Sequence, residues 1–536
     1  MTAEADNPLS PLTRELDVAQ AARYDVIVIG GGILGVCLLY EASRRGLRAL
    51  LIEKDDFGSQ TSWNSMRVLH GGFRYLQTMD LPRYIESVRA RRWFMRMFPG
   101  LTEPMNCVMP LYGKGLKRPE AFRAAVMMNR QLMRFEGRQI GEPKLHAGAV
   151  LTPSDVVQDW QRVPTAGLRG GGMWTDARML SPERMMIHLL RVAVGRGAHA
   201  LNYVSAEDLI TSGGTVKGLV AKDTETDREL RFDAPVVINA AGPWSMPMSG
   251  ALGDARPELF VPMRSFNLIV NRKPTSRSTI AATARKEGAQ TYFVMPFGEQ
   301  TILGTANVPT HRDDFNPNPS RYEVQAFLNE INEASPGLDA DLDSISCVWS
   351  GLVPATYEGA TTSSDRPVIH EHGKAGGPEG LISVSGVKFT TAPMLARRVI
   401  NPIPTRPMAP FPDVPNWQGI QEVPGYGGRP ERLLEIARDE SVRHVDDLVF
   451  RRTGLWRDTA QTLEHFLQMA AYLGLTGQDV ENERARLESI ARGSRAAASA
   501  ETHTRAARIL RPKAGAWDRC CLSPSQTHQT RRHGCH

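Results

Sequence analysis

Short apolar runs alternate with amphipathic stretches along the chain, which is typical of an α/β protein. Residues 24–29 form a β-branched run that predicts a buried strand, residues 33–45 have helical spacing, and residues 48–52 form a second apolar strand. Together they predict a βαβ unit and therefore a parallel sheet. The segments 230–244 and 380–400 repeat the step from an apolar run into a tight turn.

Residues 259–308 follow a different pattern. Apolar and polar positions alternate there, which predicts a mostly antiparallel sheet. Residues 81–98 and 119–135 are predicted to form amphipathic helices. We expect one solvated basic face and one core face on each helix, and the alternative is that they dock on a membrane surface.

The ends of the chain have weaker patterns. Residues 1–22 are expected to be a flexible lead-in, and the six prolines within residues 401–416 predict a stiff linker. Residues 417–492 should form a helical C-terminal domain, because residues 431–475 have helical spacing. Apolar periodicity is lost after about Gly493, so residues 493–536 are expected to be a disordered tail.

The composition is that of a soluble globular protein with two or three domains. The 536 residues are 41% hydrophobic and 23% charged, and a chain of this length exceeds one simple core. The formal net charge of +6 permits anionic ligands, but no run of about five basic residues points to nucleic acid. Scattered cysteines and an N-terminus without an apolar signal segment predict a cytoplasmic protein.

Three glycines in the spacing G-x-G-x-x-G directly follow the first predicted strand: Gly30, Gly32 and Gly35. Gly30 allows a tight turn, and Gly32 lets the backbone approach a pyrophosphate at the positive end of the helix dipole. Glu53 ends the next strand at about the 20-residue spacing expected for an acid that binds a ribose diol. The pattern predicts one dinucleotide, NAD or FAD, since the glycines at 169–174 follow no predicted strand.

The stretch "SMRVLHGGFRYLQ", residues 65–77, places ionisable side chains beside two adjacent glycines. Gly71 and Gly72 weaken both helix and strand, so we expect another group to approach this backbone closely. His70 and Arg74 flank the glycines and become candidates for chemistry.

Five motifs in this order resemble those of FAD-dependent glycerol-3-phosphate dehydrogenases and oxidases, which are D-amino-acid-oxidase-like flavoproteins. They are "YDVIVIGGGILG", "TSWNSMRVLHGGFRYLQ", "NAAGPW", "GVKFTT" and "DDLVFRRTGL", and the resemblance covers about residues 23–470. It implies a Rossmann-like FAD-binding domain interleaved with an antiparallel-sheet substrate domain within residues 23–400, followed by the helical C-terminal domain. The substrate part would take roughly residues 100–170 and 255–350.

The resemblance also implies that FAD is bound extended, with its adenine end at the glycine loop. Further cofactor contacts would come from four segments. The implied contacts are Thr61, Ser62 and Ser65; His70 and Gly71; Ala241 and Gly242 within residues 239–244; and Gly386, Lys388 and Thr390. By this account the flat flavin is the group that approaches the paired glycines.

Hydride transfer from a carbinol carbon requires a base for the hydroxyl proton and positive charge beside the flavin. His70 is the candidate base, and Arg74 and Lys388 are the candidate cations. Each residue also has a purely structural alternative. His70 could be a hydrogen-bonded core histidine, Arg74 could form a surface salt bridge, and Lys388 could lie at a solvated strand end.

The substrate half departs from the family pattern at four positions. Val353 stands where the family usually has an arginine that binds the substrate phosphate, and Arg366 is displaced from the usual position before an aspartate. Asn267 replaces a usual histidine and Asn307 a usual aspartate. Because valine cannot replace a bidentate arginine, we hypothesise a substrate other than glycerol 3-phosphate, contacted by Asn267, Arg366 and Arg264.

Three functions remain open: oxidation of a CH–OH group, oxidation of a CH–NH group in an amine, and flavin binding without catalysis. Electrons would pass to quinone or oxygen. The resemblance leaves open a homodimer and peripheral contact with the inner face of a membrane. No metal site is predicted, since the Cys and His residues of the tail match no compact zinc finger.

Overall fold

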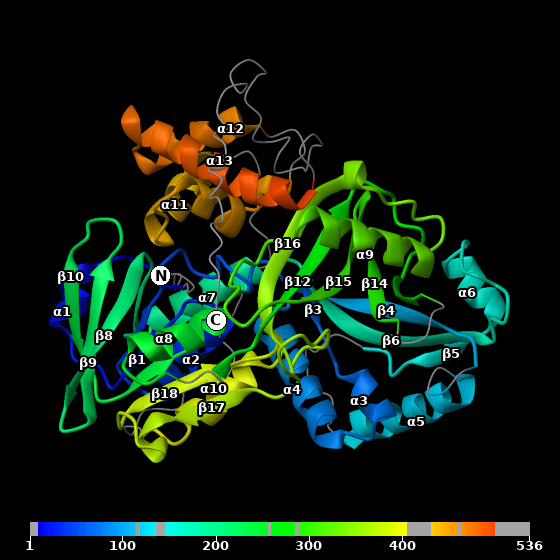
Figure 1. Cartoon of the computed structure of the whole chain (residues 1–536), viewed down its shortest axis with the longest axis horizontal. Coiled ribbons are helices and arrows are strands. Elements are labelled where there is room, and N and C mark those ends of the chain that lie inside the picture. The colour runs from blue at the N-terminus through cyan, green and yellow to red at the C-terminus, as the bar shows by residue number, and fades with distance from the viewer. Residues whose placement is uncertain are drawn as a thin grey trace, which may run out of the picture.

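Two large β-sheets carry the architecture of the chain, shown as a computed structural model in Figure 1. The structure describes residues 9–498 except 114, 116–117, 136–144, 256–258, 285–288, 405–429 and 458–461. One sheet lies to the left in Figure 1 and the other to the right, and the C-terminal helices, in orange, lie above them.

The first sheet contains the predicted βαβ unit. Strand β1 (Val26–Ile29) pairs in parallel with β2 (Ala49–Ile52) on one side and with β11 (Val237–Asn239) on the other. The full order is β17 (Val368–Glu371), β18 (Leu381–Ser385), β11, β1, β2 and β7 (His199–Leu201). Edge strand β17 is antiparallel to β18, and the other pairs are parallel. The carboxyl ends of β1, β2, β11 and β18 therefore meet at one edge, where open α/β sheets bind their ligands.

Both faces of β1 are covered, which explains its continuous apolar run. Val26 and Val28 belong to a core shared with helices on one face. These helices are α2 (Ile33–Arg44), α7 (Pro182–Val194) and α10 (Ala392–Ile400). Ile27 and Ile29 point to the other face and pack against a three-stranded sheet. Its strands are β8 (Val204–Ser212), β9 (Thr215–Asp223) and β10 (Glu229–Asp233).

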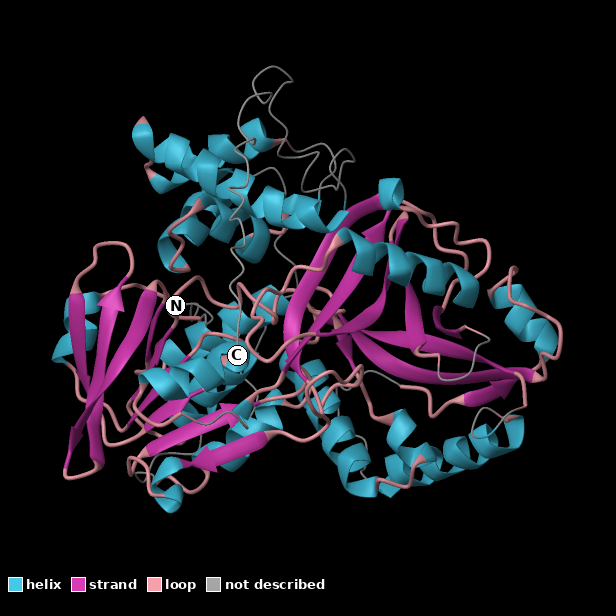
Figure 2. Cartoon of the chain, viewed as in Figure 1, coloured by secondary structure: helices cyan, strands magenta, loops and turns pink. Residues whose placement is uncertain are grey.

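The second sheet is mostly antiparallel, as the alternation in residues 259–308 predicts (Figure 2). Its order is β16 (Ile345–Pro354), β12 (Pro262–Val270), β15 (Gln300–Pro309), β14 (Thr291–Phe297), β13 (Thr279–Thr283), β4 (Thr102–Leu111), β6 (Gly170–Met179) and β3 (Val68–Leu69), with β5 (Ala149–Leu151) also paired to β6. The β13–β4 pair is parallel and joins two antiparallel halves.

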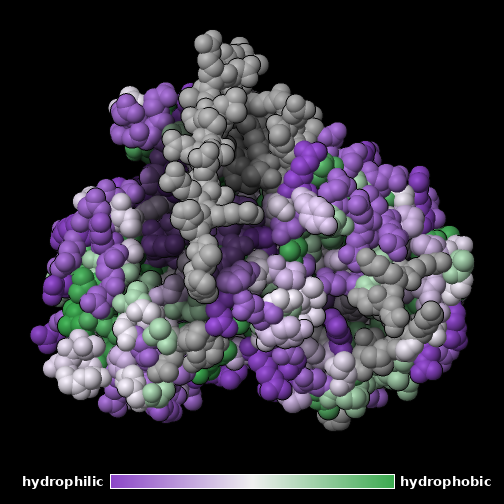
Figure 3. Space-filling view, in the orientation of Figure 1, coloured by the Kyte–Doolittle hydropathy of each residue, from purple (hydrophilic) through white to green (hydrophobic). Residues whose placement is uncertain are grey.

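Helices surround the second sheet. They are α3 (Phe73–Gln77), α4 (Leu81–Met97), α5 (Pro119–Phe135), α6 (Pro153–Asp159) and α9 (Arg321–Ala334). On α5, Phe122 and Val126 enter the core while Arg123 and Arg130 are exposed, so this helix has the expected core face and basic face. The face drawn in Figure 3 is mostly hydrophilic among the described residues. Within the part of the chain that the structure describes, no helix has the length and apolar character needed to cross a membrane.

The C-terminal region is helical. It comprises α11 (Pro430–Asp439), a π-helical turn (Asp447–Arg452), α12 (Leu463–Gln468) and α13 (Gln478–Ala498), with 3-10 turns at Leu455–Arg457 and Met469–Leu473. Shorter elements elsewhere are α1 (Leu16–Ala21), α8 (Ser245–Ala251) and 3-10 turns at Gly242–Trp244, Leu342–Ser344 and His372–Ala375. Phe450 and Trp456 join the core of the second sheet, where both stand edge-on to Trp63. The predicted fold class, with its helical C-terminal part, is confirmed.

Two expectations about the chain ends need correction. Residues 9–22 are not a flexible lead-in: Leu12 is fully buried and bridges to Glu440, and Arg14 is paired with Asp223. These partners lie hundreds of residues away, so no local pattern could reveal them. Helix α13 also continues past Gly493 to Ala498. Residues 499–536 and linker residues 405–416 lie outside the described residues.

A buried ionic cluster fastens the C-terminal region to the first sheet. The Asp56 carboxylate, a few residues after β2, accepts hydrogen bonds from Arg451 Nε at 2.5 Å and from Arg452 Nη1 and Nη2, both at 2.8 Å. Burial alone would raise the pKa of Asp56, but the charges of Arg452 and Arg451 lower it well below its usual range. Asp447 also contacts Arg451, yet burial and repulsion from Asp56 raise its pKa to about 6.

Replacing Asp56 with asparagine should lower the free energy of unfolding by about 3–5 kcal/mol, because two buried guanidinium groups lose their counter-charge. Denaturant unfolding of the purified variant and the wild type measures the difference. The matched control is Glu299→Gln. Glu299 pairs with Lys273, and both side chains are more than 80% exposed, so this change should leave the unfolding midpoint unchanged. An Asp56→Asn protein as stable as the wild type would contradict the role of the cluster.

His444 makes a second, pH-dependent contact at the same interface. Its Nδ1 lies 2.6 Å from Glu483 Oε1 on α13, and its Nε2 lies 3.2 Å from Glu225 Oε1 beside β9. Burial disfavours the imidazolium, but the two carboxylates outweigh burial and raise the pKa of His444 from 6.5 to about 9. Arg486 opposes this shift and Asp447 supports it.

Because the folded-state pKa is the higher one, the stability from His444 is fully present below pH 6.5 and is lost as the pH rises through 9. The difference in unfolding free energy between wild type and His444→Gln should therefore be on the order of 3 kcal/mol at pH 6, since one pKa unit is worth about 1.4 kcal/mol. It should approach zero above pH 9. Unfolding measured across this range tests the sign, and a difference that grows with pH would refute it.

Candidate active site

The glycine loop joins β1 to α2 in a conformation that requires glycine. Gly30 has φ +106°, and a Cβ there would lie 2.6 Å from the Ala240 carbonyl oxygen. A Cβ on Gly35 would lie 1.8 Å from the Gly30 carbonyl oxygen, so this glycine lets α2 pack against the strand. Gly32 is the N-cap of α2, and a Cβ there would have one near neighbour, Ser62 Oγ at 3.2 Å. The positive end of the helix is thus left accessible for an anion.

The segment after β2 supplies the next predicted contacts. Ile33 N–H, at the first turn of α2, donates to Ser62 Oγ over 2.9 Å. Thr61 Oγ1 donates to the Leu352 carbonyl on β16 over 3.1 Å, while Ser65 Oγ accepts locally from Arg67 N–H. Ser62 therefore lies at the glycine loop, and Thr61 lies between the loop and the second sheet.

Glu53 folds back onto the glycine loop. Its Oε2 accepts from Gly31 N–H at 2.6 Å and its Oε1 from Asp55 N–H at 2.9 Å. Burial raises the pKa of Glu53 to about 7, although these two backbone bonds lower it. The acid is where the ribose-binding residue of a dinucleotide site is expected.

The turn after β11 approaches the loop from the neighbouring strand. Asn239 orders this turn, because its Nδ2 donates to the Ser245 carbonyl at 2.8 Å and its Oδ1 accepts from Ala241 N–H at 3.3 Å. Gly242 has φ +57°, a conformation that favours glycine. The cradle of Gly30, Gly32 and Ala241 around an open helix end fits the phosphates of a dinucleotide.

His70 lies over the second sheet and contacts three groups. Its Nδ1 lies 3.5 Å from Asp176 Oδ2 on β6, its ring stacks on Phe293 with centroids 5.9 Å apart, and its backbone N–H donates to Thr390 Oγ1 at 3.3 Å. The side chain remains 43% exposed. His70 and Thr390, both predicted cofactor contacts, are thus brought together from segments 320 residues apart.

Asp176 is a site residue that sequence reasoning missed. Besides facing His70, it accepts from Gly71 N–H at 2.6 Å and from Trp174 Nε1 at 3.2 Å, and it pairs with Arg91 at 3.1 Å. Burial opposes its charge, but His70 and Arg91 outweigh burial and lower the pKa of the carboxyl. A lone aspartate within an apolar strand was the only signal that could have identified it.

The paired glycines have a structural reason in addition to the predicted one. A Cβ on Gly71 would lie 2.0 Å from Arg91 Nη1, and one on Gly72, where φ is +75°, would lie 2.8 Å from Ser87 Cβ. Helix α4 is therefore what approaches these two Cα atoms on the side where a side chain would project. That the flavin lies beside Gly71 stays a prediction, and helix α4 adds a structural reason for both glycines.

The two predicted cations differ in their surroundings. Lys388 Nζ donates to the Tyr75 hydroxyl and lies 4.9 Å from the centroid of that ring, so Lys388 reaches the helix that follows the His70 motif. Arg74 is on the exposed side of α3. Gly386 precedes Lys388, and a Cβ there would meet only ordinary contacts with Leu34 and Leu395.

Arg264 does not offer a free guanidinium to a substrate, contrary to the prediction. It is buried and forms ion pairs with Asp314 and Glu323, both at 2.8 Å, and its Nε donates to the Asn316 carbonyl. Helix α9 and the loop before it supply these partners, which a linear pattern does not reveal. Arg264 is therefore a structural residue of the second sheet.

The remaining predicted substrate residues are spread out. Asn267 is buried, and its Oδ1 accepts from Thr305 Oγ1 at 2.8 Å. Arg366 is exposed, with its backbone N–H bonded to Ser364 Oγ. Val353 lies on β16, opposite Met263. Asn307 accepts from Ser265 Oγ on β12 at 2.7 Å.

A cavity of about 560 Å³ lies behind the cofactor segment rather than at His70. It is enclosed by Gln60, Trp63, Ser350, Phe450 and Arg486, among others. Thr61 and Ser62 face β16 and the glycine loop, whereas Gln60 and Trp63 line this cavity, so neighbouring side chains of the segment point to two different places. None of the predicted site residues lines the cavity.

Comparison with known proteins identifies the class. The family model of FAD-dependent oxidoreductases of the D-amino-acid-oxidase type matches residues 25–401. The chain belongs to this family, and FAD is its cofactor. The predicted resemblance and cofactor are thereby confirmed.

Two relatives show which members of the family the chain resembles. The chain is 30% identical over 343 residues to an alpha-glycerophosphate oxidase of Streptococcus pyogenes serotype M1, which covers 63% of this chain and 55% of that protein. It is 26% identical over 449 residues to a glycerol-3-phosphate dehydrogenase of Synechocystis sp., covering 81% and 79%. The match thus spans about half the length of the glycerophosphate oxidases.

Solved structures agree on the fold. The glycerol-3-phosphate dehydrogenase of Bacillus halodurans, complexed with FAD, has a TM-score of 0.66 at 21% identity, covering 89% of this chain and 96% of that one. An L-alpha-glycerophosphate oxidase of Mycoplasma pneumoniae with FAD bound has a TM-score of 0.52 at 13% identity.

Proposed function

We propose that this chain oxidises a CH–OH group of a small hydroxyl compound, with hydride transfer to FAD. The observation that carries the proposal is the His70–Asp176 pair, placed beside Thr390. His70 belongs to the motif that resembles the glycerol-3-phosphate dehydrogenases and oxidases. A half-exposed imidazole held by a buried carboxylate has the arrangement of a general base. The named relatives support a CH–OH substrate over an amine and over a non-catalytic role.

His70 and Asp176 account for the fate of the substrate's hydroxyl proton. The substrate C–H bond breaks with its electron pair, the hydroxyl proton goes to His70 Nε2, and a carbonyl group forms. Nε2 is the acceptor because Nδ1 faces Asp176, and the lowered pKa of Asp176 keeps that carboxylate charged beside the imidazolium. FAD, when bound, supplies the hydride acceptor. Gly30, Gly32 and Ser62 would hold its phosphates.

The proposed substrate class rests on two positions that offer no free positive charge to a substrate phosphate. Val353 offers no charge where the relatives' pattern has arginine, and Arg264 is fully paired. Lys388 is the predicted cation that contacts the His70 motif from another segment, through Tyr75. An uncharged polyol or a hydroxy acid therefore suits the site better than a phosphate ester, whose dianion needs a bidentate partner.

The second substrate is an electron acceptor, quinone or oxygen. A homodimer and peripheral contact with a membrane through the basic faces of α4 and α5 belong to the same proposal. Both follow from the family likeness and from the exposed Arg89, Arg123 and Arg130.

Anaerobic titration of the purified yellow protein tests the substrate class. Flavin absorbance should bleach with a polyol or hydroxy acid and stay unchanged with glycerol 3-phosphate, because no arginine replaces Val353. Complete bleaching by glycerol 3-phosphate would refute the altered substrate while keeping CH–OH oxidation. Bleaching by amines alone would overturn the CH–OH proposal. The re-oxidation rate with oxygen or a soluble quinone then identifies the acceptor.

Changing His70 to asparagine should lower kcat roughly 10²–10⁴-fold, the usual contribution of a general base. The flavin spectrum should persist, because the glycine loop holds the cofactor without His70. The matched control is His311→Asn, whose exposed ring faces Asp313 and Glu358 and should leave kcat unchanged. Retained turnover in His70→Asn would exclude this residue as the base.

A further inference from the structure

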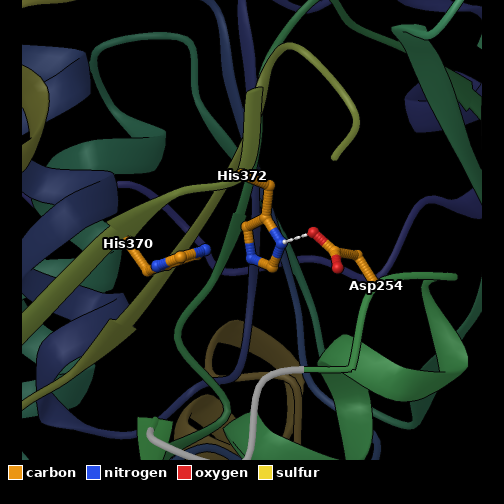
Figure 4. A group of neighbouring side chains, drawn as sticks. All are labelled: Asp254, His370 and His372. Atoms are coloured by element: carbon orange, nitrogen blue, oxygen red, sulfur yellow. Dashed lines mark hydrogen bonds and ion pairs between the residues drawn. The ribbon is translucent and has the colours of Figure 1, made fainter. Parts of the chain in front are cut away.

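Three potential metal ligands converge outside the active site, at the far edge of the first sheet. His370 is on edge strand β17, His372 begins the 3-10 turn that follows it, and Asp254 lies after α8 (Figure 4). One ligand atom from each residue lies within 4.8 Å of the other two. His372 Nδ1 is already 2.7 Å from Asp254 Oδ2.

His370 has a nitrogen without a partner. Its Nε2 is screened from solvent and makes no hydrogen bond among the described residues. The ring stands at right angles to that of His372, with centroids 4.7 Å apart. A buried nitrogen lone pair of this kind is unfavourable unless a proton donor or a metal ion uses it.

The local backbone leaves room for the Asp254 carboxylate. A Cβ on Gly377 would lie 2.1 Å from Asp254 Oδ2, so any other residue would displace the acid. Gly377 N–H donates to the His372 carbonyl at 2.9 Å, which closes the turn that presents the imidazole. Glycine at position 377 therefore allows the Asp254 carboxylate to lie beside His372.

The other nitrogen of His372 has the partner that a metal-bound histidine needs. His372 Nε2 lies 2.8 Å from Ser383 Oγ on β18, and Asn239 Nδ2 donates to the same oxygen at 3.1 Å. Metal-bound histidines commonly donate their second ring N–H to such an acceptor, which fixes the ring. If Nδ1 binds an ion, the imidazole proton moves to Nε2 and Ser383 accepts it, so the ring stays neutral.

A hydrolytic Ser–His–Asp array is excluded by burial. Ser383, His372 and Asp254 have the required order of hydrogen bonds, but Ser383 and His372 are 0% exposed. The serine oxygen also accepts from Asn239. No substrate carbonyl can reach that oxygen.

We propose that Asp254, His370 and His372 bind one divalent transition-metal ion of the Zn²⁺ class, with water as the fourth ligand. Two imidazole nitrogens and one carboxylate oxygen suit Zn²⁺ or Co²⁺, whereas Mg²⁺ and Ca²⁺ prefer oxygen ligands. Ligand atoms must lie about 2.0–2.2 Å from the ion, so binding requires the half-buried His370 ring to turn toward the other two ligands.

The ion has a structural role that does not depend on the proposed reaction. It cross-links the β17 hairpin to the end of α8. Through Ser383 and Asn239 the same cross-link reaches the Ala241 turn beside the glycine loop. The metal would therefore stiffen the cofactor cradle from behind without touching the reacting atoms.

Cobalt titration of the metal-stripped full chain tests the site. The wild type should bind one Co²⁺ in addition to any held by tail cysteines, with a d–d spectrum that lacks thiolate charge transfer. His370→Ala should lose this signal, and Ser383→Ala should weaken binding about 10–100-fold. The control His311→Ala should bind as the wild type does. A titration identical in wild type and His370→Ala would overturn the proposal.

Thermal unfolding provides a readout independent of activity. Zn²⁺ should raise the Tm of the wild type and leave that of His370→Ala unchanged, and Mg²⁺ should affect neither. His370 is only half-buried, so this variant should fold. Equal Zn²⁺ shifts in both proteins, or no shift in either, would show that the three residues form only a hydrogen-bonded array.

Discussion

The buried carboxylate of Asp56 is the contact on which the rest of the molecule depends. It lies three residues after Glu53 and is neutralised by Arg451 and Arg452, almost four hundred residues further along the chain. Neither the carboxylate nor the guanidinium groups could remain buried alone, since an unpaired ion in the interior costs several kcal/mol. The cluster therefore orders the segment that leads to Ser62, and Ser62 in turn meets the first turn of α2. The shape of the cofactor loop thus depends on the docking of the C-terminal helices.

The same rule governs charge in the second sheet. Arg91 is buried against Asp176, and Arg264 is enclosed by Asp314 and Glu323. Once these pairs form, His70 remains half-exposed, and Arg74 of the same motif is exposed. The proposed base is thus a residue whose carboxylate partner is itself paired with a buried arginine. The altered substrate belongs to the same proposal, because Val353 carries no charge and Arg264 is already paired.

Several particulars could be predicted because their causes are local. The run from β1 through Gly30, Gly32 and Gly35 to Glu53 follows from strand periodicity and from the backbone demands of a tight turn. The alternation in residues 259–308 likewise predicts the antiparallel strands of the second sheet. The two wrong predictions, Arg264 as a substrate contact and a flexible lead-in at residues 9–22, share one cause, because neither could be judged without its distant partners.

Sequence alone determined the fold class and the dinucleotide loop, because periodicity and glycine spacing act within a few residues. Only the tertiary structure decided which charged side chains are paired with one another. It paired Arg264 with Asp314, placed Asp176 beside His70, and brought Asp254 to His372 across 118 residues. Each of these facts depends on which side chains meet across the core, and a buried charge is stable only where that meeting supplies its partner.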